Sequence, residues 1–227
     1  MSVIRFDSVS KRYPGGREAL IDVTFQADAG EMLFVTGHSG AGKSTLLKLI
    51  ALVERPSHGR VEVHGRDLSR LAHRDVPALR REIGVVFQDH RLLPDRSVAD
   101  NVALPLVIAG VPHAERKARI NSALEKVGLS GRGADLPVGL SAGEQQRVGI
   151  ARAIVARPAL IIADEPTGNL DPQLSEEIMQ LFVVLRGTGA TILVATHDLP
   201  LLKRVKQRVL VLDHGHVIDD VPASEVA

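Results

Sequence analysis

A glycine-rich loop is the part of this sequence whose residue types and spacing can bind phosphate. It matches the pattern G-x-x-x-x-G-K-[ST] through Gly37, His38, Ser39, Gly40, Ala41, Gly42, Lys43, Ser44 and Thr45. Glycines let backbone N–H groups surround phosphate oxygens, and a helix amino end adds a favourable dipole. We expect Lys43 to reach the β- and γ-phosphates and the Ser44 hydroxyl to ligate Mg²⁺, so the loop predicts ATP binding. The alternative is a structural turn. The apolar run 32–35 before the loop and the helical stretch 46–50 after it disfavour that alternative, because they supply the expected strand–loop–helix context.

Two carboxylates offer the chemistry that a bound triphosphate needs. Asp164 and Glu165 directly follow the apolar run 160–163, which places them at the exit of a buried strand, where open α/β sheets bind ligands. Asp164 is suited to hold Mg²⁺, and Glu165 to polarise an attacking water as a general base. An ordinary strand end is the alternative, but the nearby phosphate loop favours the catalytic interpretation.

A second glycine-containing helix start lies at 140–147, with the sequence LSAGEQQR. Ser141 and Glu144 have the spacing of a capping box, so a well-capped helix is one interpretation. The other is a second anion site at the helix amino end. One ATP bound within the chain cannot obviously use both sites.

Short apolar runs that alternate with helical patterns must position these residues, and they indicate an α/β fold. The expected strands are 3–6, 32–36, 84–87, 160–163, 191–195 and 209–212. Residues 97–157 show helical patterns and no convincing strand. We therefore predict one domain over 1–227, with an α/β core at 1–96 and 158–227, a β-rich amino-terminal part and an inserted helical subdomain at 97–157.

Composition excludes several other functions. The formal net charge of +1 argues against a dedicated nucleic-acid binder, and the absence of cysteine excludes disulfides, cysteine–zinc sites and thiol catalysis. The longest uncharged stretch, 101–114, is shorter than the ~20 residues that a membrane helix needs. The amino terminus lacks the apolar run of a secretory signal. A role at a membrane would therefore require a partner that holds the chain there.

Taken together, these motifs resemble the ABC ATPase family. Residues 140–147 are similar to its signature Leu-Ser-Gly-Gly-Gln, and 169–171 match its D-loop. Tyr13 lies where the family stacks an aromatic ring on adenine, Gln88 matches its glutamine loop, and His197 matches its switch histidine. The resemblance covers roughly 4–217. It implies a P-loop NTPase core with an inserted helical subdomain, and ATPase activity.

The resemblance also implies an ATP-dependent, head-to-tail homodimer. Each ATP would lie between one phosphate loop and the partner's signature segment, which places Ser141 and Gly143 on the partner's nucleotide. It implies that Tyr13 stacks on adenine and that Ser44, Gln88 and Asp164 bind Mg²⁺. It also implies that Lys43, Glu165 and His197 act in catalysis. The alternative for Tyr13 is that it is a partly buried surface aromatic with no role in nucleotide binding. The alternative for His197 is that it is an ordinary core histidine.

Within the family, the chain is most similar to the branch that serves bacterial cell division, on the stretches 30–50 and 87–103. That similarity implies an integral membrane partner, other division proteins as further partners, and a peripheral location on the cytoplasmic face of the inner membrane at the septum. A lipoprotein-releasing or macrolide-type exporter ATPase is the alternative. A cassette acting on ribosomes or DNA normally needs two cassettes or long coiled coils, which 227 residues do not accommodate.

Three features leave open questions. Ala142 replaces a signature glycine, which would weaken the contact with the partner if this position needs a positive φ. His214 and His216 invite a metal-site interpretation, but we expect a solvated turn because no cysteine or suitably spaced carboxylate accompanies them. Leu92 and Leu93 lie among charged residues and either dock the membrane partner or pack the helical subdomain against the core.

Overall fold

The computed structural model describes residues 2–226 and contains two sheets and seven α-helices within that range. The larger sheet has six strands in the order β10-β9-β3-β8-β7-β6. All its neighbouring strands pair in parallel except β10, which is antiparallel to β9. The strands are β3 (Met32–Thr36), β6 (Ile83–Val86), β7 (Leu160–Asp164), β8 (Thr191–Ala195), β9 (Arg208–Asp213) and β10 (His216–Val221).

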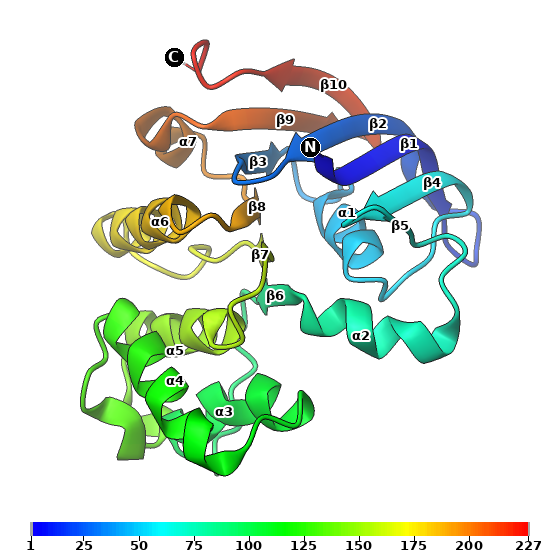
Figure 1. Cartoon of the computed structure of the whole chain (residues 1–227). Coiled ribbons are helices and arrows are strands. Elements are labelled where there is room, and N and C mark those ends of the chain that lie inside the picture. Colours follow the sequence, from blue (N-terminus) through cyan, green and yellow to red (C-terminus); the bar gives the residue numbers. More distant parts are fainter. Residues whose placement is uncertain (1, 227) are drawn as a thin grey trace.

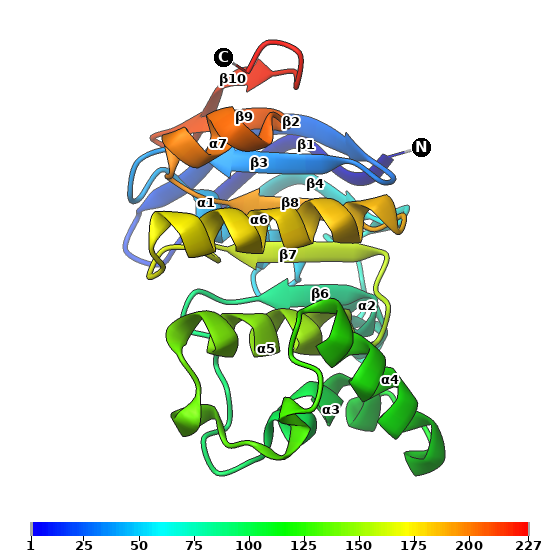
Figure 2. The ribbon, with the colours of Figure 1, turned by 90° about the vertical axis from the view of Figure 1, so that its left-hand side faces the viewer.

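Helices cover both faces of this sheet. Helices α6 (Pro172–Gly187) and α7 (Leu199–Val205) lie on one face, and α1 (Lys43–Ile50) lies on the other (Figures 1 and 2). Because successive side chains of a strand point to opposite faces, the buried residues of β3 divide between two cores. Phe34 packs with the core under α6, and Val35 packs with the core around α1. Burial on both faces explains why this strand is apolar throughout.

The β-rich amino-terminal part is a separate antiparallel sheet with the strand order β2-β1-β4-β5. Its strands are β1 (Ser2–Arg12), β2 (Glu18–Asp28), β4 (His58–Val63) and β5 (Arg66–Asp67). Only 3–6 was predicted here. The other strands were missed because one face of this sheet is exposed, so β2 alternates between buried and exposed residues instead of forming an apolar run.

In the larger sheet, the predicted strands 32–36 and 191–195 begin and end at the same residues as β3 and β8 in the structure. The others differ at their ends. Strand β6 begins and ends one residue earlier than predicted, β7 extends through Asp164, and β9 gains one residue at each end. Strand β10 was missed, because its residues range from half-buried to exposed and form no apolar run.

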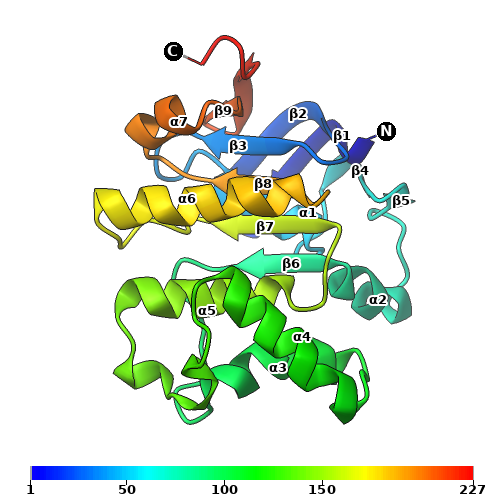
Figure 3. The same cartoon turned by 60° about the vertical axis from the view of Figure 1, so that its left-hand side comes forward.

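Between 97 and 157 the described elements are helical (Figure 3). They are α3 (Val98–Ile108), α4 (His113–Lys126) and α5 (Ala142–Ile154), with the short 3-10 turns Arg132–Ala134 and Pro137–Gly139. Helix α2 (Val76–Arg81), preceded by a 3-10 turn at His73–Asp75, lies before β6. In α4 the residues Ala123 and Leu124 are buried, as is Val127 directly after the helix. None of the helices in 2–226 is long and apolar enough to cross a membrane.

Candidate active site

The phosphate loop connects β3 to α1 and depends on close backbone packing. A Cβ atom on Gly37 would lie 2.1 Å from the carbonyl oxygen of Leu212, and one on Gly42 would lie 2.6 Å from that of Ala19. Both glycines have positive φ angles, 146° and 116°. A residue with a side chain at either position would clash with neighbouring backbone, so these glycines fix the path of the loop.

Lys43 is buried at the first turn of α1, and its amine contacts three oxygens. Its Nζ donates hydrogen bonds to the carbonyl oxygens of Gly37 at 2.7 Å and His38 at 3.2 Å. It also lies 3.6 Å from Glu165 Oε1. The amine is thus held at the mouth of the loop by acceptors that a phosphate oxygen can replace.

Ser44 and Asp164 form the second pair of the site. The Ser44 hydroxyl donates to Asp164 Oδ1 at 3.1 Å. Burial raises the pKa of Asp164, while the Ser44 hydrogen bond and Lys43 oppose that rise. A desolvated carboxylate beside a hydroxyl is a set of hard oxygen ligands that gains from a divalent cation. These two residues therefore fit Mg²⁺.

Glu165 is held in an uncommon backbone conformation at the end of β7. Its φ is +46°, its N–H donates to the carbonyl oxygen of Ala195 at 2.9 Å, and its carboxylate lies 2.9 Å from His197 Nδ1. Non-glycine residues in this region are strained and cluster at functional sites. The His197 side chain is 66% exposed, so the alternative of a core histidine is wrong.

The loop, Glu165 and His197 line one cavity of about 830 Å³. Its lining also includes Tyr13 and Gln88, which lie far apart in sequence. The lining residues are Tyr13, Pro14, Arg17, His38, Ser39, Gly40, Gly42, Lys43, Ser44, Thr45, Lys48, Gln88, Glu165 and His197. The sequence analysis missed Arg17 and Lys48, although both are cations close to predicted site residues and that proximity was a usable signal.

Tyr13 is half-buried at the edge of this cavity. Its hydroxyl lies 3.5 Å from Thr45 Oγ1, and the amine of Lys11 is 5.0 Å from the centre of its ring. A cation over a ring face is favourable, so Lys11 helps to hold the ring in place.

The loop after β6 connects this cavity to α5. His90 and Arg91 both have positive φ angles there, and their carbonyl oxygens accept hydrogen bonds from the Arg152 guanidinium at 2.5 and 2.7 Å. The His90 ring is also hydrogen-bonded to the fully buried Gln146 of α5. A displacement of the glutamine loop is therefore linked directly to the helix that carries the signature segment.

The signature segment lies outside this cavity. Ser141 caps α5 as predicted: its Oγ accepts from Glu144 N, and Glu144 Oε2 accepts from Ser141 N. Ala142 is exposed and its φ is not positive, so the concern about its backbone does not apply. Gly143 is buried, and a Cβ there would lie 2.3 Å from Leu174 Cδ2. Among the described residues, Ser141 and Gly143 do not reach the nucleotide site of their own chain.

Comparison with known proteins agrees with this geometry. Residues 20–168 match the ABC transporter family. The cell division ATP-binding protein FtsE of Escherichia coli is 57% identical over 95% of this chain and 97% of its own length. The methionine import ATP-binding protein MetN of Caulobacter vibrioides is 46% identical over 99% of this chain but 68% of its own length. A dimeric ATP-binding cassette bound to ADP and phosphate has a TM-score of 0.88 at 34% identity, over 97% of this chain and 98% of that one.

The chain belongs to the ABC transporter family and has the fold of its ATPase domain, an α/β P-loop NTPase. It binds ATP and hydrolyses it. Cassettes of this kind dimerise, as the dimer bound to ADP and phosphate illustrates.

Proposed function

We propose that this chain is the ATPase subunit of a bacterial cell-division complex of the FtsE type. The observation that carries the proposal is the match to FtsE over nearly the full length of both chains. MetN is similar over the same residues, but this chain spans only 68% of MetN's length. The difference in coverage favours the cell-division role over that of an import or export ATPase.

In the proposed catalytic step, Lys43 and the loop amides bind the β- and γ-phosphates, and Tyr13 stacks on adenine. Ser44, Gln88 and Asp164 would hold Mg²⁺, which would offset the negative charge of the phosphates. Glu165 accepts a proton from the attacking water, and His197 contacts the γ-phosphate. The 2.9 Å contact between His197 and Glu165 supports a paired role, because each orients the other.

We further propose that ATP closes a head-to-tail homodimer. Two observations support this arrangement: the signature segment lies outside its own chain's cavity, and it contains the amino end of α5, a position that favours anions. Ser141 and Gly143 would then bind the partner's nucleotide. ATP favours the closed state because it contacts both chains only there, and hydrolysis removes that preference.

The proposed membrane partner is an integral membrane protein of the FtsX type, with other division proteins as further partners. We propose that 97–157 act as the helical subdomain that moves relative to the core formed by 1–96 and 158–227. The proposed docking surface is the loop after β6, with the exposed Leu93, together with a groove of about 300 Å³ that Val85, Phe87 and Arg91 help to line. The chain would then sit on the cytoplasmic face of the inner membrane at the septum.

Affinity purification from native membranes tests this function. We expect an FtsX-type protein to co-purify with the wild-type chain and to be enriched when Glu165→Gln slows ATP hydrolysis and holds the complex closed. Recovery of a solute permease or lipoprotein exporter in its place would support the exporter alternative and contradict the cell-division role. Fluorescence microscopy of a tagged chain is the independent check, with a septal band as the expected result.

A further inference from the structure

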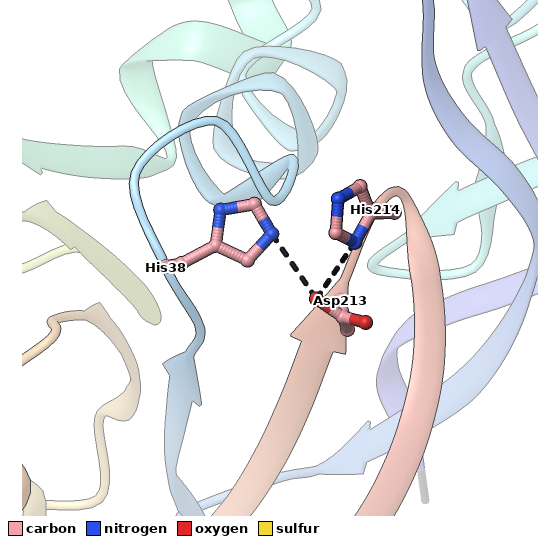
Figure 4. Close-up of side chains that lie close together, drawn as sticks. All are labelled: His38, Asp213 and His214. Carbon is pink, nitrogen blue, oxygen red and sulfur yellow. Dashed lines mark hydrogen bonds and ion pairs between the residues drawn. The ribbon is translucent and has the colours of Figure 1, made fainter.

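Three side chains with metal-binding atoms meet beside the phosphate loop, away from the carboxylates of the active site (Figure 4). His38 belongs to the loop, Asp213 ends β9, and His214 lies in the turn to β10. Asp213 Oδ1 is 3.1 Å from His38 Nε2 and 2.9 Å from His214 Nδ1. One ligand atom from each residue lies within 4.8 Å of the others. Sequence analysis expected a solvated turn at His214 and His216 because it found no cysteine or suitably spaced carboxylate. Asp213 directly precedes His214 in the sequence, and His38 joins them only in the fold.

Backbone contacts hold the two segments of this cluster together. Gly215 N–H donates to the carbonyl oxygen of Ala41 at 3.0 Å, and the Gly215 carbonyl accepts from Ile21 N–H at 2.8 Å. Gly37, which directly precedes His38, also lies close to the backbone of Leu212, which directly precedes Asp213. The β9–β10 turn is therefore fixed against the phosphate loop independently of the three side chains.

The hydrogen bond of His38 Nδ1 leaves Nε2 available as a metal ligand. Its Nδ1 lies 2.6 Å from the carbonyl oxygen of Ser39, which can only accept, so Nδ1 carries a hydrogen. In a neutral imidazole Nε2 then has a lone pair and no hydrogen. His38 Nε2 and Asp213 Oδ1 lie 3.1 Å apart, so one metal ion can bind both atoms.

We propose that His38, Asp213 and His214 form a binding site for a divalent transition-metal ion of the zinc class. One metal ion can engage the nitrogens of both histidines and the Asp213 carboxylate together, because these atoms lie within 4.8 Å of one another. Two imidazoles and one carboxylate suit zinc, with water in the remaining position, and they suit Mg²⁺ poorly. The bond from His38 Nδ1 to a backbone carbonyl is the arrangement that orients metal-binding histidines.

Exposure of the ligands allows the site to close on an ion. The side chains of His38 and His214 are 46% and 79% exposed, so both rings can rotate toward the ~2.0–2.2 Å ligand distances of zinc. Because His38 also lines the nucleotide cavity, a bound ion would place positive charge at the edge of that cavity.

Calorimetric titration of the purified full-length chain with zinc chloride tests the site. The protein for this titration is prepared without a histidine tag, and the buffer contains no nucleotide because nucleotides chelate zinc. We expect one zinc ion per wild-type chain, and absorption bands of tetrahedral cobalt when Co²⁺ replaces zinc. His214→Gln and Asp213→Asn should each weaken zinc binding at least ~10-fold, since even residues that only orient metal ligands are worth about 10–100-fold.

His216→Gln is the matched control, because His216 is also exposed but lies outside the cluster. We expect this variant to bind zinc as the wild type does. Circular dichroism and thermal unfolding identify any variant that fails to fold, and Asp213→Asn and His214→Gln test the site independently of each other. The proposal is overturned if the wild type takes up no stoichiometric zinc, if both ligand variants bind normally, or if His216→Gln weakens binding equally. The zinc titration does not depend on the cell-division role.

Discussion

The amine of Lys43 and the carboxylate of Glu165 lie 3.6 Å apart, with side chains only 8% and 14% exposed. The proposed phosphate ligand and the proposed general base thus contact each other. Opposite charges at this distance and low exposure attract strongly. A γ-phosphate that binds Lys43 would compete with this contact and leave Glu165 available to a water molecule.

Lys43→Ala should weaken ATP binding at least ~10-fold, because hydrogen bonds to charged groups contribute about 1.5–3 kcal/mol. Nucleotide titration by calorimetry measures the loss. Lys203→Ala, on the exposed surface of α7, is the control and should bind ATP normally. Unchanged affinity in Lys43→Ala would rule out the role proposed for the phosphate loop.

Glu165→Gln should retain ATP binding but hydrolyse ATP about 10²–10⁴-fold more slowly, because an amide cannot accept the proton of water. Phosphate release measures the rate, and size-exclusion chromatography should show an ATP-bound dimer that accumulates. A variant with the wild-type rate would show that another residue is the base.

Asp164→Asn should raise the melting temperature of the nucleotide-free chain at neutral pH. Burial raises the pKa of Asp164 above its ordinary value of 3.8, so the folded state favours the protonated form. The stability gained from that preference is present at low pH and is lost as pH rises through the folded-state pKa. An asparagine side chain does not ionise, so the variant does not lose this stability as pH rises. Its advantage in melting temperature over the wild type should therefore shrink as pH falls toward 4.

Thermal unfolding at several pH values without Mg²⁺ checks this prediction, and hydrolysis assays should show that the stabilised variant has lost activity. A lower melting temperature than the wild type at pH 7 would contradict it.

Ala142→Gly and Gly143→Ala should have opposite outcomes. Position 142 is exposed and has no positive φ, so its glycine variant should lose at most about 1 kcal/mol of stability and dimerise with ATP as the wild type does. The methyl group of Gly143→Ala would collide with Leu174, and overpacking costs about 1–3 kcal/mol. Chemical denaturation and ATP-dependent dimerisation measure both. Equal effects of the two variants would contradict this difference.

Leu93→Glu should retain ATP hydrolysis and lose co-purification with the membrane partner. Leu93 is 41% exposed, whereas Leu92 packs partly against the core, so the packing alternative applies to Leu92. Val184→Glu, on the exposed side of α6, is the matched control and should keep the partner. Retention of the partner by Leu93→Glu would place the docking surface elsewhere.

The phosphate loop, the acidic strand end and the capped signature helix were predictable from sequence because each is formed by consecutive residues. Strands β3 and β8 were predicted correctly for a related reason: burial on both faces of a parallel sheet leaves an uninterrupted apolar run. The antiparallel strands β2 and β4 were missed because burial on one face leaves a weaker, alternating pattern.

Only the tertiary structure decided which distant residues meet. It packed Leu174 against Gly143 and brought Tyr13, Gln88 and His197 to one cavity. It also placed His38 beside Asp213 and His214, from opposite ends of the chain. Strand order explains the contact of His38 with Asp213 and His214, because β3 and β9 are neighbours in the sheet although far apart in sequence. Local patterns determine the chemistry of each segment, and the order of strands determines which segments can act together.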